Sequence, residues 1–323
     1  MEKRLQYALK DEKLVHIQTV EKGLACGCVC PSCGSRLVAR KGNKKIHHFA
    51  HYNTKECNNC VETALHMLAK EILLEEMHFL VPPVLLKFPN SYKASEVIFD
   101  ERVIHFDKAC VENRIGDIIP DLIFDINGRR LLVEIYVTHD IDEEKNRRIN
   151  NLSISTLRID LSKLDYSTSK EALRDALINE SENKTWIYNE RERVLYERFK
   201  AKAHPFERAA KGDGVFCPQY LHGWKGVSSA RWVDCIYCKY CFSMAGEANC
   251  LGYSGVSKIE DLDNPNLAQK AEKLRKENNI RPSWYRGSQC EKCKKGYWVI
   301  RNGKSGEFLG CTNYPNCHNT IRI

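Results

Sequence analysis

Two acidic side chains, Asp121 and Glu134, stand where a carboxylate is costly unless it is paired or bound to a cation. Pro120-Asp121 ends one apolar stretch, and Glu134 lies in the middle of the next. A hairpin between the two stretches would bring the carboxylates together, and a divalent cation would relieve their repulsion. Mg²⁺ prefers one or two carboxylates with water and phosphate oxygens. The pair therefore suits hydrolysis of a phosphodiester by water on Mg²⁺ or Mn²⁺.

Each acidic residue also has a structural interpretation when it is taken alone. A Glu in a strand can lie at a sheet edge, and an Asp after Pro can form a turn. Glu62, on a predicted helix, can belong to a solvated face. Taken together and in this order, the three residues favour the catalytic interpretation.

The elements that position these carboxylates follow from the apolar pattern. Residues 61–77 combine good helix formers with an apolar stripe, and Glu62, His66 and Lys70 then share one helix face. Asn127-Gly128, between two apolar runs, is the strongest short hairpin signal. The elements predicted after the helix are strands at 117–124 and 131–137, a helix at 142–150 and a strand at 155–161. This order predicts an α/β core with a mixed sheet.

The same residues carry a family resemblance. The run PDLIFDINGRRLLVEIYVTHDIDEEK, followed by IDLS and preceded by ETALHMLAKE, resembles the nuclease core of competence protein CoiA-like proteins, a branch of the PD-(D/E)XK superfamily. The resemblance covers roughly residues 28–165 and implies a mixed sheet flanked by helices. It also implies that Asp121 and Glu134 bind the catalytic metal, and that Glu62 on the preceding helix completes the site.

One position departs from the superfamily motif. The motif has Lys two residues after the second acid, where a cation orients water or stabilises the transition state, and this sequence has Tyr136. In the catalytic interpretation Lys145, on the next predicted helix, or His139 takes over that role. The departure leaves open an alternative, in which the fold serves DNA binding or recombination without catalysis.

The sixteen cysteines include several Cys-x-x-Cys pairs, in a chain without an export signal, and this indicates zinc sites rather than disulfides. Near the N-terminus Cys30 and Cys33 form one pair. The candidates for the two remaining ligands are His47, His48, His51, Cys57 and Cys60. The spacing allows Cys57 with Cys60, whereas the resemblance to CoiA-like proteins implies His51 with Cys57 and makes Cys60 less typical.

The last cysteine cluster has the sharpest spacing. Residues 288–323 resemble the four-cysteine ribbons at the C-terminus of bacterial type I topoisomerases, which implies structural zinc bound by Cys290, Cys293, Cys311 and Cys317. Interleaved aromatic and basic residues suit single-stranded nucleic acid, which binds by stacking and phosphate contact. The predicted contacts are Arg286, Lys294, Lys295, Trp298, Arg301 and Lys304. At least half of the aromatic residues are expected to form the miniature core.

A third zinc ion is predicted between these clusters. Cys235 and Cys238 are the favoured pair, with Cys217 and either His222 or Cys250 completing the site. Because Cys241 follows three residues after Cys238, the run permits a second register. Two or three structural zinc ions are thus expected.

Charge and composition limit the partners. The net charge is +8, and residues 191–323 hold 23 Lys and Arg against 13 Asp and Glu, whereas residues 1–190 hold 27 against 29. Such an excess favours a polyanion, here DNA that is single-stranded or has single-stranded regions, although charge and stacking do not distinguish DNA from RNA. Without a membrane span or a signal peptide, the chain is predicted to be cytoplasmic, with no membrane association.

Together these patterns predict a Mg²⁺- or Mn²⁺-dependent deoxyribonuclease whose zinc ribbons hold nucleic acid. The predicted segments are an N-terminal zinc ribbon at 1–60, a PD-(D/E)XK-like nuclease core at 61–180, a charged helical linker at 181–214, a middle Cys-rich zinc module at 215–255 and a topoisomerase-type ribbon at 285–323.

Overall fold

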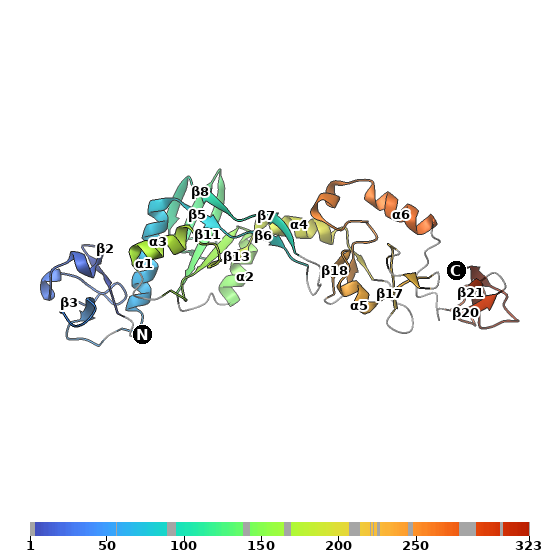
Figure 1. Ribbon diagram of the computed structural model, residues 1–323, viewed down its shortest axis with the longest axis horizontal. Helices are drawn as coiled ribbons and strands as arrows, with labels where there is room; N and C mark the ends of the chain where they lie inside the picture. The colour runs from blue at the N-terminus through green and yellow to red at the C-terminus, as the bar shows by residue number, and fades with distance from the viewer. Residues whose placement is uncertain are drawn as a thin grey trace. The chain divides into compact units, whose positions relative to one another are not determined.

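The computed structural model describes most of the chain, in two compact units. The described residues are 4–55, 57–88, 95–137, 143–164, 169–206, 214–219, 221, 223–224, 227–244, 248–277, 289–303 and 306–322. The first unit comprises residues 1–84 and 99–190, and the second comprises 85–98 and 191–323. Figure 1 labels their helices and strands.

The first unit is built on a mixed five-stranded sheet in the order β13-β12-β11-β10-β9. Strands β11 and β12 are parallel, and the other neighbours are antiparallel. The elements in chain order are α1 (Cys60–Glu76), β9 (Lys108–Val111), β10 (Leu122–Ile126), β11 (Arg129–Tyr136), α2 (Glu143–Leu152), β12 (Thr156–Asp160), α3 (Lys170–Ile178) and β13 (Lys184–Tyr188). The predicted mixed α/β architecture is confirmed.

The central hairpin forms where the sequence predicts it. Asn127 and Gly128 both have positive φ, 48° and 76°, which a tight two-residue hairpin turn requires. The first predicted strand, 117–124, was placed too early. It begins at Leu122, because the chain at 115–118 is folded back in an Ile115–Ile118 bridge and Pro120 has no N–H to donate.

Two apolar layers cover the sheet. One face packs Val133 and Ile135 against α1 and α3, and the other packs Leu132 against Ile149 of α2. Helices α1 and α3 lie side by side (Figure 1), and ion pairs such as Arg174 with Glu76 at 2.8 Å join them. Since side chains alternate along a strand, Glu134 shares the α2 face with Leu132.

The N-terminal residues of this unit form small hairpins around their own core. The strands are β1 (Tyr7–Lys10), β2 (Lys13–His16), β3 (Leu37–Arg40) and β4 (His48–His51), with short 3₁₀ turns at Ile17–Thr19 and Leu24–Cys26. Cys26 and Cys28 are buried in that core with Leu5 and Leu37. Strands β5 (His78–Val81) and β8 (Arg102–His105) form a further two-stranded pair in this unit, while β6 (Val84–Leu86) pairs with β7 (Glu96–Phe99), and most residues of that pair belong to the second unit.

The second unit has a separate aromatic core. Phe88, Phe199 and Phe242 meet edge to face, with ring centroids 5.4 and 6.3 Å apart. Its elements are α4 (Glu190–Lys200), β14 (His204–Pro205), β15 (Gly214–Phe216), β16 (Gly223–Trp224), β17 (Val227–Arg231), α5 (Trp232–Ile236), β18 (Cys241–Ser243), β19 (Asn249–Cys250), a 3₁₀ turn at Ile259–Asp263, α6 (Leu267–Glu277), β20 (Trp298–Gly303), β21 (Gly306–Cys311) and β22 (Thr320–Arg322).

The predicted segment limits differ from these units in two places. Strand β13 lies inside the range that the sequence assigned to a charged linker, because Lys184–Tyr188 pairs with β12 and extends the sheet. Residues 85–98, placed in the nuclease core by position, cluster instead with the second unit, where Leu86 and Phe88 enter its core. Among the described residues, no helix is both long enough and apolar enough to cross a membrane.

Candidate active site and zinc clusters

Asp121 lies immediately before β10, in a nest of donors. The Ile135 N–H donates to its Oδ2 at 2.8 Å, His66 Nε2 lies 2.9 Å from the same oxygen, and Lys70 Nζ lies 3.0 Å from Oδ1. Lys70 also reaches Glu112, at 2.7 Å. Burial would raise the pKa of Asp121, but the His66, Ile135 and Lys70 contacts outweigh it and lower the pKa to about 2. Asp121 is therefore ionised at neutral pH.

Glu134 lies inside β11 with only 3% of its surface exposed. Its Oε2 accepts a hydrogen bond from Lys145 Nζ of α2 at 2.7 Å, while its Oε1 is buried with no hydrogen-bond partner among the described residues. Burial raises the pKa of Glu134, and the Lys145 ammonium opposes that rise. One oxygen of this carboxylate is thus satisfied and the other remains able to take a ligand.

The two carboxylates are neighbours, as the hairpin prediction requires. Asp121 binds the N–H of Ile135, which is the residue after Glu134, and the negative charge of Asp121 contributes to the raised pKa of Glu134. Lys145 lies in α2, the helix after β11, and contacts Glu134 from there. His139, the other candidate for that role, lies outside the described residues.

A cation lies close to Tyr136, the residue that occupies the position of the motif lysine. The Arg158 guanidinium lies over the Tyr136 ring, 4.2 Å from its centroid, and Arg158 is the residue of β12 that pairs with Glu134. Arg158 also contacts Asp160 at 3.2 Å. Arg158 carries no local signal in the sequence, because only the parallel register of β11 and β12 places it beside Glu134.

The helix face predicted to carry Glu62 faces Asp121. His66 and Lys70, one and two turns beyond Glu62, both contact Asp121. The shared helix face is predictable from the sequence, whereas the contacts of His66 and Lys70 with Asp121 are not. Among the described residues, the ligand atoms of Glu62, Asp121 and Glu134 do not all lie within 4.8 Å of one another. Asp121 and Glu134 are neighbours on the hairpin, and His66 and Lys70 reach Asp121 from α1.

The N-terminal metal cluster joins Cys30, Cys33, His51 and Cys57, whose ligand atoms all lie within 4.8 Å of one another. Cys30 Sγ is 3.6 Å from Cys57 Sγ, and Cys33 Sγ is 3.3 Å from His51 Nε2. Strand β4 ends at His51, which brings the ring to the turn that holds Cys30 and Cys33. Of the five candidates for the last two places, the geometry selects His51 and Cys57.

The predicted ligand Cys60 lies outside this cluster. Its thiol donates to the Cys57 carbonyl at 3.4 Å, and its side chain is buried in the N-terminal core at the start of α1. Because α1 begins at Cys60, the thiol points into the N-terminal core and not toward the zinc ligands, where the Cys-x-x-Cys spacing alone would place it.

The C-terminal cluster holds all four predicted cysteines, Cys290, Cys293, Cys311 and Cys317, again within 4.8 Å. Cys293 and Cys311 have their sulfurs 3.6 Å apart, and the Gly296 N–H donates to Cys293 Sγ at 3.3 Å. Thiolate and imidazole are the donors that zinc prefers, and four of them close a tetrahedron. Both clusters therefore fit structural Zn²⁺ and leave no position for catalysis.

Some of the residues predicted to contact nucleic acid on this ribbon are exposed, and one of them is buried. Lys294 and Lys295 are exposed, and Arg301 lies 5.6 Å from the centroid of the Tyr314 ring. Trp298 was predicted to contact nucleic acid, but it is only 1% exposed and forms the ribbon core, so its face is not available for stacking. The exposed rings are instead those of Tyr297 and Tyr314. Arg286 and Lys304 lie outside the described residues.

The middle cysteines are less tightly grouped. Cys217, Cys235, Cys238 and Cys250 are all described, yet they are not among the groups whose ligand atoms lie within 4.8 Å. His222, the alternative to Cys250, lies outside the described residues.

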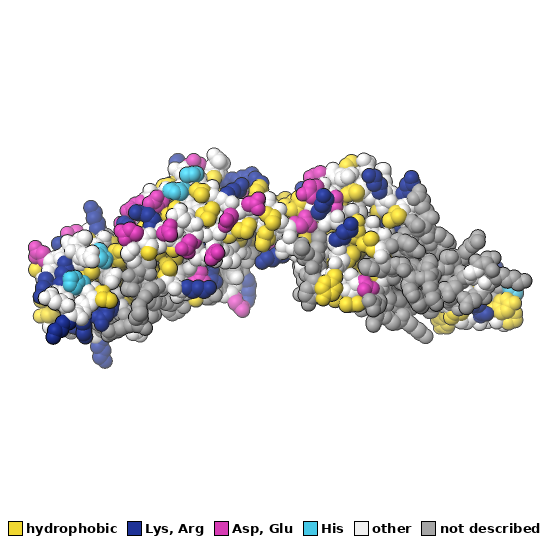
Figure 2. Space-filling view, in the orientation of Figure 1, with side chains coloured by type: hydrophobic (Ala, Val, Ile, Leu, Met, Phe, Trp, Pro, Cys, Tyr) yellow, Lys and Arg dark blue, Asp and Glu magenta, His cyan; other side chains and the backbone are white. Residues whose placement is uncertain are grey.

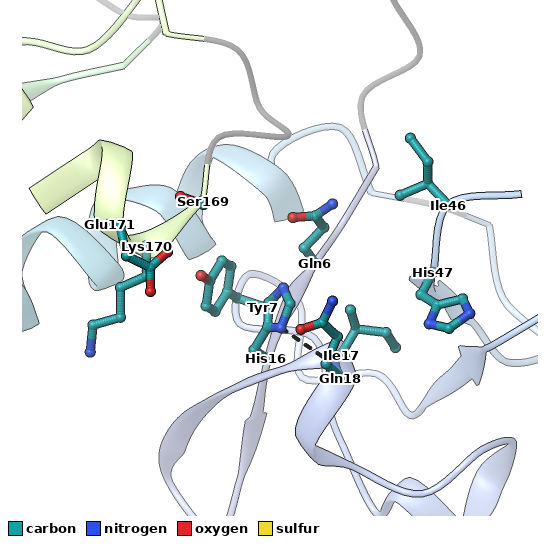
Figure 3. Close-up of a pocket in the computed structure, with 10 residues that line it drawn as sticks. All are labelled: Gln6, Tyr7, His16, Ile17, Gln18, Ile46, His47, Ser169, Lys170 and Glu171. Carbon is teal, nitrogen blue, oxygen red and sulfur yellow. Dashed lines mark hydrogen bonds between the residues drawn. The ribbon is translucent and has the colours of Figure 1, made fainter.

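A pocket of the first unit lies away from the carboxylates. The cavity of about 490 Å³ opens between the N-terminal hairpins and the start of α3, where Tyr7 and His16 face Ser169, Lys170 and Glu171 (Figure 3). The Tyr7 and His16 rings lie 4.9 Å apart, and His47, one of the candidate zinc ligands considered from the sequence, also lines the cavity.

Two segments of the chain match known protein families. Residues 11–59 match the N-terminal domain of competence protein CoiA, and residues 287–323 match the topoisomerase DNA-binding C4 zinc finger. The resemblance to a CoiA-like protein with a topoisomerase-type zinc ribbon is confirmed. The CoiA match holds the Cys30 cluster and ends before Glu62, so it does not reach Asp121 or Glu134. No solved structure matches the chain.

Proposed function

We propose that the first unit is a metal-dependent DNA nuclease of the PD-(D/E)XK type. The observation that carries the proposal is the buried carboxylate of Glu134, with one oxygen on Lys145 and the other without a partner, next to the ionised Asp121. A buried polar atom without a partner is rare in a folded protein and points to a missing ion or ligand.

The order of elements supports this assignment. Helix α1, the meander β9-β10-β11, the crossover α2 and the parallel strand β12 follow one another, with Asp121 at the start of β10 and Glu134 inside β11. This is the arrangement that the resemblance implies for a mixed sheet with its carboxylates on the central hairpin. The fold therefore supplies the scaffold that the chemistry needs.

Each polar group has a distinct task in the proposed reaction. When bound, Mg²⁺ or Mn²⁺ supplies an activated water and neutralises charge on the phosphodiester. Asp121 and Glu134 Oε1 would hold it, with Glu62 assisting. Lys145, next to Glu134 on the same sheet face, offers its ammonium to the phosphate or the attacking water, in the role of the lysine that Tyr136 replaces.

DNA is the proposed substrate because both units hold basic residues and the C-terminal ribbon has exposed aromatic rings. Residues 4–55 hold ten Lys and Arg against three Asp and Glu, and Figure 2 shows dark blue side chains gathered over these residues. The C-terminal ribbon presents Tyr297 and Tyr314 beside Lys294 and Arg301, which suits a single strand held by stacking and phosphate contact. The names of both matched families, a competence protein and a DNA-binding zinc finger, agree with DNA binding in DNA uptake.

The test is cleavage of single- and double-stranded DNA by the purified chain with Mg²⁺ or Mn²⁺, compared with Glu134→Gln. The matched control is Glu143→Gln, a highly exposed carboxylate at the start of α2. We expect wild type and Glu143→Gln to cut, and Glu134→Gln to bind DNA without cutting. Equal cutting by Glu134→Gln and the control would overturn the assignment.

A second function has its own support. Both oxygens of Asp121 are engaged by His66, Lys70 and the Ile135 N–H, and Tyr136 stands in place of the motif lysine. These contacts suit a nuclease fold retained as a DNA-binding or recombination-accessory protein. Binding of DNA by wild type without cleavage under any divalent cation would favour this function, and the same assay with RNA would establish the choice of nucleic acid.

A further inference from the structure

The second unit contains five cysteines outside the two metal clusters. Cys217 follows β15, Cys235 lies in α5, Cys238 lies in the turn before β18, and Cys241 and Cys250 are paired residues of β18 and β19. Neither family match covers these residues. Their surroundings can be compared with those of the two clusters.

The turn at Cys238 has the hydrogen bonds of a zinc knuckle. Cys238 Sγ accepts from the N–H groups two and three residues ahead, those of Tyr240 and Cys241. Cys30 and Cys290, the first cysteine of each matched cluster, accept from the N–H groups at the same two positions. Such donors stabilise a thiolate more than a neutral thiol, because a bond to a charged acceptor is stronger.

Cys250 repeats a feature of the C-terminal ribbon. The Gly252 N–H donates to Cys250 Sγ at 3.2 Å, just as the Asn313 N–H donates to Cys311 Sγ at 3.4 Å, two residues ahead in each case. A Cβ at Gly252 would lie 3.1 Å from both Cys250 Sγ and Pro218 Cγ. The sulfur of Cys250 is thus close to the residue that follows Cys217.

A glycine lies against each of these two sulfurs, Gly252 against Cys250 Sγ and Gly296 against Cys311 Sγ. A Cβ at Gly296 would lie 2.4 Å from Cys311 Sγ, which parallels the close approach of Gly252 to Cys250 Sγ. Because real Cβ atoms essentially never approach another atom that closely, a side chain at Gly296 would displace the sulfur. Each sulfur therefore occupies space that is open only because the neighbouring residue is a glycine.

The middle cysteines also share one neighbourhood. Cys235 packs against the cluster that contains Cys217, Cys241 pairs with Cys250 across β18 and β19, and the Cys238 N–H donates to the Cys235 carbonyl at 3.1 Å. Thiolates brought together repel, so they require a cation. The apolar cluster around Cys217 contains only Val215 and Ala230 as further buried members among the described residues, too little to hold the segment alone. A bound metal would supply the missing folding energy.

We propose that Cys217, Cys235, Cys238 and Cys250 bind a third structural zinc ion. Zinc fits because four thiolates form the closed tetrahedral site that it favours. Binding draws together sulfurs that are farther apart than those of the two other clusters. Cys235, and not Cys241, is the fourth ligand, because Cys235 packs against the cluster that contains Cys217.

The test is the zinc content per chain of the purified full-length protein, measured by mass spectrometry of the native protein and by elemental analysis. We expect three zinc ions in wild type and two in Cys217→Ser and Cys250→Ser. The matched controls are Cys110→Ser, an exposed cysteine of β9, and Cys241→Ser, and both keep three.

Two results would overturn the site. One is a wild-type chain that holds two zinc ions after incubation with excess zinc, a count that needs no variant to fold. The other is three ions in Cys250→Ser. Loss of one ion in Cys241→Ser together with three ions in Cys235→Ser would overturn the proposed ligand set.

Discussion

The carboxylate site and the C-terminal ribbon differ in what holds their polar groups together. Asp121 and Glu134 belong to a sheet packed on both faces, and Lys145 reaches Glu134 from α2. Leu132 packs against Ile149 of α2 on one face, and Val133 and Ile135 pack against α1 and α3 on the other. The ribbon has a core of Trp298, Leu309 and three of its own cysteines. Apolar packing therefore builds the first site before any ion binds, whereas the second needs its metal in order to fold.

The largest expected effect is the loss of a zinc-binding thiolate in the ribbon, which tests whether the ribbon needs its metal in order to fold. In Cys311→Ser we expect strands β20 and β21 to unfold, since apparent zinc-binding energies in small metal domains are about 10–16 kcal/mol. Strands β10 to β12 should stay folded. Hydrogen exchange of the backbone amides measures both regions in one sample, with Cys110→Ser as control. Protected β20 amides in a zinc-free variant would contradict the comparison.

Lys145→Met tests the carboxylate site. Removal of the ammonium leaves Glu134 buried without its cation, so we expect cleavage to fall about 10²–10³-fold, as for other lost electrostatic contacts in active sites. The unfolding free energy should fall by about 1–3 kcal/mol at neutral pH, which denaturant titration measures. Arg147→Met, an exposed cation on the same helix, is the control. If Lys145→Met matches this control in both assays, Lys145 does not belong to the site.

The pH dependence of stability separates the two carboxylates. The lowered pKa of Asp121 gives stability that is present above the ordinary value of 3.8 and is lost as pH falls toward about 2. The raised pKa of Glu134 acts the other way, because the folded state then binds its proton more tightly, so stability decreases as pH rises above the ordinary value of 4.5.

Denaturant titrations from pH 2 to 7 measure both effects. We expect Asp121→Asn to lose about 2 kcal/mol relative to wild type at pH 7 and almost nothing near pH 2. Glu134→Gln should gain stability relative to wild type as pH rises through the raised pKa. Parallel curves for all three proteins would show that burial does not perturb these groups.

The smallest expected effect is at Arg158. Its position beside Glu134 and over Tyr136 suits contact with a phosphate, so Arg158→Gln should raise KM for DNA a few-fold and leave kcat nearly unchanged. The slope of log affinity against log salt should decrease by about one, as for one lost phosphate contact. Arg130→Gln, an exposed cation of β11, is the control. A large fall in kcat would instead place Arg158 among the catalytic groups.

Several features were predictable because they depend on local chemistry. The Asn127-Gly128 turn fixes the hairpin, and the hairpin fixes Asp121 and Glu134 as neighbours. The four C-terminal cysteines follow from spacing, since a zinc knuckle needs two thiolates close in the chain. Features that depend on packing were missed, among them the burial of Trp298 and the insertion of residues 85–98 into the second unit.

By itself the sequence determined the order of the elements, the metal-ligand spacings and the acidic pair on one hairpin, because apolar periodicity, turn residues and ligand types act over a few residues. Only the tertiary structure decided that His66 and Lys70 contact Asp121, and that Arg158 lies beside Glu134. These contacts join residues far apart in the chain. The packing of α1 and the parallel register of β11 and β12 select them, and neither leaves a local signal in the sequence.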